Sequence, residues 1–296
     1  MTSCPILSFI GFGEAAQAFC EGWGATPPAA IKAYDVKTES EASADAKRAD
    51  YRRHGVAGCD SLRAAIQDAG AVISVVTADQ AVVAAQSAAA VMAPGAFFFD
   101  CNSVAPVTKQ VAAEAIAAAG GRYVDVAVMA PVRPALLAVP LLLAGPSAGE
   151  GLALLARLGF GGRIVAGGIG AASAIKMIRS IMIKGLEALT AECLLSARAA
   201  GVDDEVIASL DASFPGWNWR ARGNYNLDRM LVHGQRRAAE MRESAITAAS
   251  LGQTGAMASA TADWQQRLGA LGLSPPPDGL AAKADTILAI AESSRP

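Results

Sequence analysis

The chain has 296 residues, which is enough for one large or two moderate domains that each bury a hydrophobic core. Its 25 Lys and Arg residues and 27 Asp and Glu residues give a formal net charge of −2, and without a basic excess nucleic acid is not expected as a partner. Five scattered cysteines without C-x-x-C spacing and only two histidines argue against a disulfide framework, a metal centre and a His-dependent serine triad.

The first predicted strand, residues 6–11, runs directly into a helix through the pattern G-x-G-x-x-A. In such a turn the first glycine permits the bend, and the second lets the backbone approach a pyrophosphate. The small third residue lets the helix pack closely on the strand, and the free N–H groups at the helix start face the anion. We therefore expect an NAD(P)-binding turn formed by Gly11, Phe12, Gly13, Glu14, Ala15 and Ala16.

The second predicted strand, residues 31–36, contains an acid about 20 residues after this turn, as the dinucleotide-binding pattern requires. A carboxylate at Asp35 accepts hydrogen bonds from the ribose 2′-hydroxyl and repels a 2′-phosphate, which favours NAD. Lys37 lies two residues further on and leaves NADP open. The alternative is that Asp35 only begins a solvated turn.

Short apolar runs then alternate with Ala-rich helical stretches. The predicted strands are residues 71–77, 96–100, 123–128 and 140–145, and the predicted helices are residues 60–68, 79–92 and 106–119. This alternation predicts βαβ units, and hence a Rossmann-type doubly wound, mainly parallel sheet with helices on both faces. Ligands of such a sheet bind at the carboxyl ends of its strands.

Polar residues follow two of these strands. After the strand at 71–77 we expect Thr77, Ala78 and Gln80 to contact the cofactor. After the strand at 96–100, Asn102 and Ser103 open the next helix, where the helix dipole and free N–H groups favour a carboxylate. Asn102 is therefore expected to contact cofactor and substrate, and Ser103 to contact substrate. In both segments an ordinary helix cap is the alternative.

From residue 167 onward the sequence pattern becomes helical, with one long helix predicted at residues 171–200 and a final one at 280–292. The predicted organisation is an NAD(P)-binding domain at 1–166 and an all-α domain for substrate binding and dimerisation at 167–296.

The long helix carries a polar stripe in an apolar setting. Lys176, Ser180, Lys184 and Glu187 have the spacing i, i+4, i+8 and i+11, which places them on one narrow face. Burial and a neighbouring cation both lower the pKa of a lysine, which suits it to act as a general base near neutral pH. Alternatively, both ammonium groups reach solvent or pair with acids.

Taken together, these motifs resemble the β-hydroxyacid dehydrogenase family, which includes 3-hydroxyisobutyrate and 6-phosphogluconate dehydrogenases. Residues 11–16 resemble the cofactor turn of the family, residues 100–106 its D-x-[SN]-[ST]-x-x-P substrate motif, and residues 170–180 its G-x-x-x-x-x-K-x-x-x-N motif. The resemblance implies that Lys176 is the catalytic lysine. Ser180 stands where the family usually has Asn, so at this position of the catalytic site a shorter hydroxyl replaces an amide.

A second departure concerns residues 125–131, which correspond to the D-A-P-V-S-G-G segment of the family. Met129 and Ala130 fall at substrate-binding positions, but Pro131 has no N–H and Ala130 is bulkier than Gly, so the family's anion-binding nest of N–H groups cannot form in the same way. The expected substrate is therefore not 3-hydroxyisobutyrate.

In the C-terminal half, residues 232–241 resemble the phosphogluconate-dehydrogenase-like subgroup of this family, which has a distinct C-terminal domain. There we expect His233 and Arg236, together with Lys184, to bind an anionic or ring-bearing substrate. The Trp, Arg and Tyr residues at 217–225 offer an aromatic wall and guanidinium groups to such a substrate. Alternatively, these arginines make structural or subunit contacts. The helical half is expected to form a homodimer.

The predicted activity is interconversion of a β-hydroxy acid, or a related alcohol, and its keto form by hydride transfer, with loss of carbon dioxide left open. Imine reduction and non-catalytic dinucleotide sensing are the alternatives. Because the first strand begins near Met1 and the apolar run at 135–144 is too short to span a bilayer, we expect a cytoplasmic protein without a membrane partner.

Overall fold

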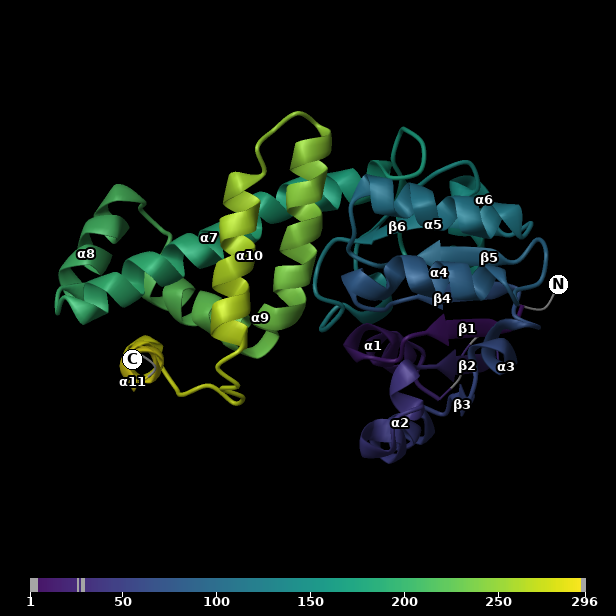
Figure 1. The fold of residues 1–296 in the computed structure, drawn as a ribbon, viewed down its shortest axis with the longest axis horizontal. Coiled ribbons are helices and arrows are strands. Elements are labelled where there is room, and N and C mark those ends of the chain that lie inside the picture. The colour runs from purple at the N-terminus through teal and green to yellow at the C-terminus, as the bar shows by residue number, and fades with distance from the viewer. Residues whose placement is uncertain (1–4, 26, 28–29, 294–296) are drawn as a thin grey trace. The chain divides into compact units, whose positions relative to one another are not determined.

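A computed structural model describes residues 5–25, 27 and 30–293 of the chain. The chain divides into two compact units between Met177 and Ile178. The first unit combines a sheet with helices, and the described part of the second unit is helical (Figure 1). Helix α7 (Ala171–Ala199) begins in the first unit and continues into the second. The domain boundary expected after residue 166 stays a prediction.

Eight strands of the described residues form one sheet in the order β3-β2-β1-β4-β5-β6-β7-β8. Their bounds are β1 (Leu7–Ile10), β2 (Ile31–Tyr34), β3 (Ala57–Gly58), β4 (Ala71–Ser74), β5 (Phe97–Asp100), β6 (Arg122–Val128), β7 (Leu141–Ala144) and β8 (Arg163–Ile164). The strand order reverses between β1 and β4, so the ligand crevice of such a sheet lies at the carboxyl ends of these two strands. The expected doubly wound fold is confirmed.

Six helices of the first unit connect these strands. They are α1 (Glu14–Trp23), α2 (Glu41–Arg53), α3 (Leu62–Ile66), α4 (Ala81–Ala89), α5 (Pro106–Ala118) and α6 (Ala148–Arg157), with short 3-10 helices at Val36–Thr38, Ala78–Gln80 and Leu136–Ala138. Pro106 begins α5 at a position where its missing N–H costs no helical hydrogen bond.

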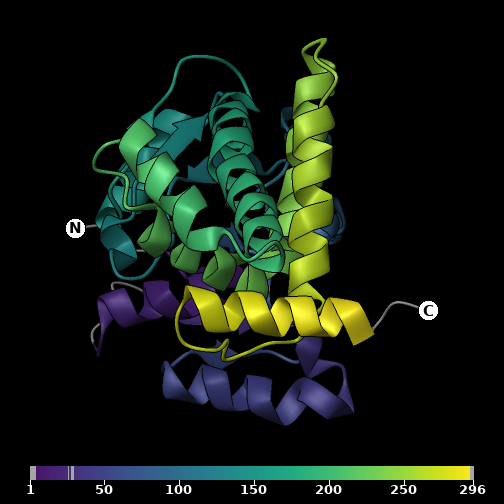
Figure 2. The ribbon, with the colours of Figure 1, turned by 90° about the vertical axis from the view of Figure 1, so that its left-hand side faces the viewer.

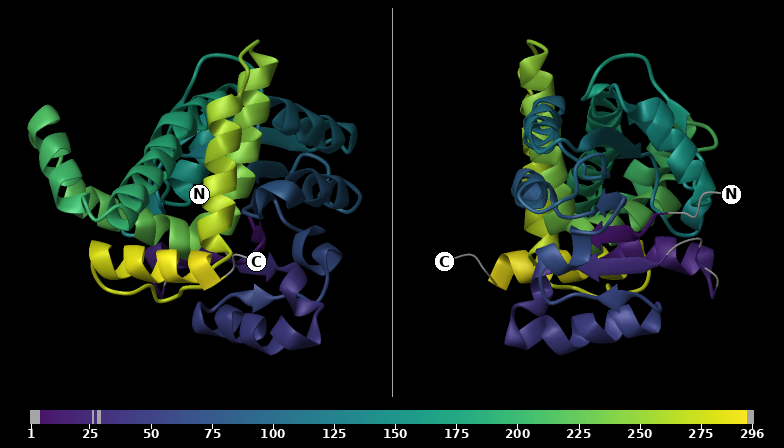
Figure 3. Two further views of the ribbon diagram at one scale, coloured as in Figure 1. Left: turned by 60° about the vertical axis from the view of Figure 1, so that its left-hand side comes forward. Right: turned by 90° about the vertical axis from the view of Figure 1, so that its right-hand side faces the viewer.

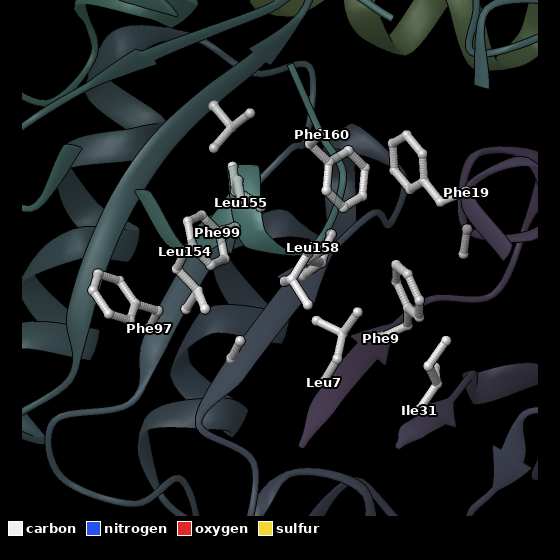
Figure 4. Packing of buried hydrophobic residues seen from close by; sticks show 14 of the residues in the cluster. Leu7, Phe9, Phe19, Ile31, Phe97, Phe99, Leu154, Leu155, Leu158 and Phe160 are labelled. Carbon is white, nitrogen blue, oxygen red and sulfur yellow. The ribbon is translucent and has the colours of Figure 1, made fainter. Parts of the chain in front are cut away.

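Side chains of the strands alternate between two hydrophobic clusters on opposite faces of the sheet. Phe97 and Phe99 of β5 belong to the cluster under α1 and α6, and Phe98 belongs to the cluster under α3, α4 and α5. Figure 4 shows the first cluster, where Phe9 of β1 stacks on Phe19 of α1 with ring centroids 6.5 Å apart. Burial on both faces explains why these strands read as continuous apolar runs.

The sheet differs from the expectation in three details. Strands β3 and β8 have two residues each, which is too short for an alternating pattern to be visible in the sequence. Strand β7 pairs antiparallel with β6, whereas β1 to β6 pair in parallel. The sheet is therefore mainly parallel, as expected, with a reversed edge formed by β7 and β8.

The second unit contains the remainder of α7 together with α8 (Asp203–Ser213), α9 (Trp219–Ser250), α10 (Ala256–Gly269) and α11 (Leu280–Ser293). Helices α9 and α10 lie side by side as an antiparallel pair in Figures 1 and 3, and α11 runs across them in Figure 2. The backbones of α9 and α10 touch, because a Cβ added to Gly234 would lie 2.3 Å from the carbonyl oxygen of Gln265. Only glycine permits this approach.

Candidate functional site

The glycine turn between β1 and α1 has the geometry that its sequence predicts. Gly11 has φ +85°, and a Cβ there would lie 2.7 Å from the carbonyl oxygen of Val75. Gly13 is exposed, and no described heavy atom lies within 4 Å of the position of an added Cβ. Ala16 is fully buried against the sheet. The open space at Gly13 and the uncapped N-terminus of α1 therefore fit a dinucleotide pyrophosphate.

The other members of the turn differ in exposure. Glu14 is exposed, Ala15 is half-buried and Phe12 is buried. The carbonyl oxygen of Phe12 accepts hydrogen bonds from Gln17 and Lys47. The backbone of the turn is thus held from α1 and from α2 at the same time.

Asp35 joins the end of β2 to this turn. Its Oδ2 accepts a 2.8 Å hydrogen bond from the N–H of Phe12, and its Oδ1 accepts a 3.0 Å bond from the N–H of Lys37. Each carboxylate oxygen has a second lone pair, so Asp35 can still accept a hydrogen bond from a ribose hydroxyl. Lys37 itself is exposed and lies in the 3-10 helix that follows β2.

Lys47 of α2 is a buried cation at this place that the sequence analysis missed. Its Nζ lies 3.9 Å from Oδ2 of Asp35 and 3.0 Å from Oδ2 of Asp50, and it donates to the carbonyl oxygen of Phe12 at 2.7 Å. The helical spacing of residues 44, 47 and 51 could have indicated that Lys47 is buried, because all three face the interior from α2.

The segment after β4 lies at the same edge of the sheet. Thr77 and Gln80 are exposed, and Ala78 is buried. Hydrogen bonds from the side chains of Gln80 and Thr77 hold the pKa of Asp79 below its ordinary value. The cofactor contacts expected of Thr77, Ala78 and Gln80 stay predictions.

Asn102 ties the ends of two neighbouring strands together. Its Oδ1 accepts a 2.7 Å bond from the N–H of Val76 after β4, and its Nδ2 donates to Oγ of Ser74 at 3.0 Å. This side chain therefore has a structural task beside any contact with cofactor or substrate.

Ser103 and Lys176 meet in the first unit, although 73 residues separate them. Nζ of Lys176 donates a 2.6 Å hydrogen bond to Oγ of Ser103. Ser103 follows β5 and Lys176 lies in the second turn of α7, and both side chains are half-buried. A serine and a lysine in contact at the ligand-binding edge of the sheet can bind a substrate hydroxyl and exchange its proton.

Three charged side chains of the same unit are completely buried. Nζ of Lys109 is 3.0 Å from Oδ1 of Asp100 and 3.5 Å from Oδ1 of Asp125. Burial lowers the pKa of Lys109, but the two carboxylates outweigh it, so the pKa lies above its ordinary value and the side chain stays charged. Neither Lys109 nor its contacts were anticipated from the sequence.

Burial also shifts the pKa values of Tyr123 and Cys101, which lie beside this cluster. Burial and the Asp100 carboxylate raise the pKa of Tyr123 well above its ordinary value, so its hydroxyl remains a donor to Oδ2 of Asp100 at 2.6 Å. Burial raises the pKa of the Cys101 thiol to about 12. Cys101 is therefore protonated at neutral pH and unsuited to act as a nucleophile.

Met129 and Ala130 follow β6. The N–H of Met129 donates to the carbonyl oxygen of Pro140 at 2.9 Å, and Ala130 and Pro131 are exposed. The Met129 amide is thus engaged within the sheet edge, and Pro131 has no amide hydrogen.

In the second unit the polar stripe of α7 is paired internally. Nζ of Lys184 lies 2.9 Å from Oε2 of Glu240 and donates to Oγ of Ser180 at 3.2 Å. The carboxylate of Glu187 accepts hydrogen bonds from Arg237 and, at 2.8 Å, from Gln265. For Lys184, Glu240 is an acidic partner of the kind that the alternative interpretation of the lysine stripe requires. The roles expected of Ser180 and Lys184 stay predictions.

His233 and Arg236 belong to an open hollow of about 290 Å³ in the second unit, and this hollow is lined by Val232, His233, Gln235, Arg236 and Gly269. At the start of α9, the guanidinium of Arg222 lies 4.4 Å from the ring centroid of Trp217, so these aromatic and basic side chains contact one another. Substrate contacts of His233 and Arg236 stay predictions.

No group of three or more His, Cys, Asp or Glu residues placed to hold a metal ion occurs within residues 5–25, 27 and 30–293. In the same ranges, no helix combines the length and the apolar character needed to cross a membrane.

Two parts of the chain match known protein families. Residues 7–149 match the NAD binding domain of 6-phosphogluconate dehydrogenase, and residues 197–268 match a domain of unknown function, DUF1932. No curated protein matches the chain.

Several solved structures are similar to the chain. A conserved hypothetical protein from Sinorhizobium meliloti 1021 is 39% identical, with a TM-score of 0.71 and coverage of 96% of both chains. A conserved protein of unknown function, described as structurally similar to 3-hydroxyacid dehydrogenases, is 27% identical over 90% of this chain and 99% of its own, with a TM-score of 0.63. The 3-hydroxyisobutyrate dehydrogenase of Mycobacterium tuberculosis, solved with L-serine, is 18% identical over 97% of this chain and 99% of its own, with a TM-score of 0.69.

The chain therefore belongs to the β-hydroxyacid dehydrogenase family. It is an oxidoreductase that uses NAD(P), as the glycine turn predicted.

Proposed function

We propose that this oxidoreductase acts on the CH–OH group of a β-hydroxy acid or a related alcohol, with Lys176 as general acid and base. The observation that carries the proposal is the 2.6 Å hydrogen bond between Nζ of Lys176 and Oγ of Ser103. It lies at the carboxyl edge of a sheet whose β1–α1 turn fits a dinucleotide, which is where a substrate of such a fold binds.

When bound, the nicotinamide accepts a hydride in one direction and donates it in the other. Lys176 takes the hydroxyl proton at Nζ during oxidation and returns it to the substrate oxygen during reduction. A serine hydroxyl both accepts and donates, so Ser103 can hold the amine of Lys176 and bind the substrate oxygen at the same time. If the product is a β-keto acid that loses carbon dioxide, Lys176 also protonates the resulting enol.

The substrate carboxylate is proposed to bind through side chains. The N–H of Met129 is engaged with Pro140, and Pro131 has no N–H, so backbone donors are scarce after β6. This argues for a substrate other than 3-hydroxyisobutyrate.

NAD is the preferred cofactor in this proposal. The Asp35 carboxylate lies beside the glycine turn and repels a 2′-phosphate. Lys47 at 3.9 Å reduces this repulsion without abolishing it, because Lys47 also neutralises Asp50.

The proposed assembly is a homodimer built on the helical half. Met182 and Leu189 of α7 are 66% and 61% exposed, and Met257 of α10 is 67% exposed, which leaves apolar surface for a second copy. A monomeric mass by light scattering would contradict this assembly.

The activity is tested by nicotinamide absorbance with NAD and NADP against a panel of small, phosphorylated and aromatic 3-hydroxy acids. Lys176→Ala is expected to lower kcat by about 10²- to 10⁴-fold, the range for loss of a general acid–base group. Lys32→Ala is the control, since Lys32 lies near the start of β2, away from the carboxyl edge. Cofactor affinity should be unchanged in both variants.

Turnover that survives Lys176→Ala would remove this lysine from its role and favour the reduction of imines. Unaltered cofactor binding without turnover on any substrate would favour a sensing protein.

A further inference from the structure

The buried cluster of Asp100, Lys109 and Asp125 connects two segments that carry the proposed catalytic pair. All three side chains have no solvent exposure, and the paired positions of β5 and β6 bring the two carboxylates together. Lys109 reaches both of them from α5. Strand alternation explains the placement, because Asp100 and Asp125 share the face that α5 covers.

The first segment is the loop after β5. Oδ1 of Asp100 accepts a 3.0 Å bond from the N–H of Asn102, and the carbonyl oxygen of Asp100 accepts a 2.5 Å bond from Nζ of Lys109. The backbone that leads into Ser103 is therefore anchored on Asp100 and Lys109.

The second segment is the beginning of α7. Oδ2 of Asp125 accepts bonds from the N–H groups of Gly170 at 3.0 Å and Ser173 at 3.1 Å. Gly170 has φ +98°, and a Cβ there would lie 2.8 Å from Cβ of Pro106. These bonds fix the first turn of the helix in which Lys176 lies one turn further on.

We propose that Lys109 is a positioning residue that holds Ser103 and Lys176 at hydrogen-bond distance by joining Asp100 to Asp125. Its ammonium group is the one cation that bridges these carboxylates among the described residues. Removing it breaks the link from the carboxylate and carbonyl oxygen of Asp100 to Asp125, so the loop after β5 is no longer held against the start of α7. The importance of this position for turnover rests on the proposed function, but the positioning itself can be measured without turnover.

The experiment measures how fast the Lys176 amine is acetylated by acetic anhydride, followed by peptide mass spectrometry on the full chain. The Ser103→Ala variant shows how fast the Lys176 amine is acetylated when it has lost its contact with Ser103. We expect this rate to exceed the wild-type rate about fivefold. Lys109→Met is expected to reach the same rate, and adding Ser103→Ala to Lys109→Met should change nothing further.

Lys283→Met is the matched control. Lys283 is also buried and pairs with an acid, Asp228 at 3.1 Å, but it lies in the second unit. It should lower the melting temperature as Lys109→Met does, and leave the acetylation rate of Lys176 at the wild-type value. Binding of NADH, followed by its fluorescence, checks that the first unit is folded in each variant.

If Lys109→Met does not fold, Lys109→Met with Asp125→Asn takes its place. This double variant removes one positive and one negative charge, so the net charge of the cluster is the same as in the wild type. The ionic bridge through Lys109 is still absent. The proposal expects fast acetylation of Lys176 in the double variant as well. A wild-type rate in either folded variant, or the same increase in Lys283→Met, would overturn it. Because no substrate is involved, failure of the dehydrogenase proposal would show separately in the turnover of Lys176→Ala.

Discussion

The N–H of Phe12 donates a 2.8 Å hydrogen bond to Oδ2 of Asp35, which follows it by 23 residues. This bond ties the loop proposed to bind the pyrophosphate to the acid proposed to bind the ribose. Lys47 completes the arrangement by binding the carbonyl oxygen of Phe12 and lying 3.9 Å from Asp35. Changes intended to alter cofactor choice should therefore leave Asp35 itself in place.

Val36→Arg is expected to shift cofactor preference toward NADP. Val36 directly follows Asp35 and is 63% exposed, so a guanidinium there can reach a 2′-phosphate without disturbing the buried bonds of Asp35. The ratio of the dissociation constants for NADP and NAD, measured by calorimetry, should fall at least about tenfold, or ~1.4 kcal/mol.

The control for this charge change is Val111→Arg on α5, where the valine is 47% exposed. An equal shift in the control would mean that general electrostatic attraction, and not contact at the ribose, causes the effect.

Gly13→Ala is expected to weaken NAD binding without weakening the fold. No described heavy atom lies within 4 Å of the added Cβ, so the methyl group occupies only the space proposed for the pyrophosphate. Calorimetry should show a loss of affinity of about tenfold or more, or ~1.4 kcal/mol. The melting temperature of the protein without cofactor should stay close to that of the wild type.

Gly11→Ala provides the contrast, because its φ of +85° and the 2.7 Å approach to the Val75 carbonyl make this position intolerant of a side chain. The left-handed conformation alone costs roughly 1–2 kcal/mol, so the melting temperature should fall. Equal melting temperatures of the two variants would contradict this account of the turn.

Asp285→Asn is expected to reduce the stability of the second unit above about pH 4 and to have little effect in stronger acid. Arg198 binds Asp285 through two hydrogen bonds of 2.7 and 2.9 Å, and these bonds hold the pKa of Asp285 below its ordinary value of 3.8. Stability from a lowered pKa is present above the ordinary value and is lost as the pH falls through the lower value of the folded state.

Melting temperatures of wild type and variant between pH 3 and pH 7 test this expectation, with Asp263→Asn on an exposed position of α10 as control. A difference between wild type and Asp285→Asn that stays constant over this range would show that the ion pair contributes nothing.

Much of the fold was predictable because it depends on local patterns. The apolar runs of β1, β4, β5, β6 and β7 are buried on both faces, and β2 alternates between buried and half-buried residues. The long helix α7 ends beside Gly201, whose φ is +71°. The two-residue strands β3 and β8 were missed, since strands of that length exist only through their partners. The reversed direction of β7 also depends on pairing and not on composition.

By itself, the sequence determined the class of fold and the glycine turn, and it predicted candidates for proton transfer on one helix, because these depend on spacing along one strand or helix. Only the tertiary structure decided which charges share a site. Lys47 and Lys109 look like ordinary helical lysines in the sequence, yet folding places them against Asp35 and between Asp100 and Asp125. Lys184, on the same stripe as Lys176, pairs with Glu240, whereas Lys176 contacts Ser103. The physical reason is that the partner of a buried charge comes from a distant part of the chain, and its identity is settled only when the strands and helices pack.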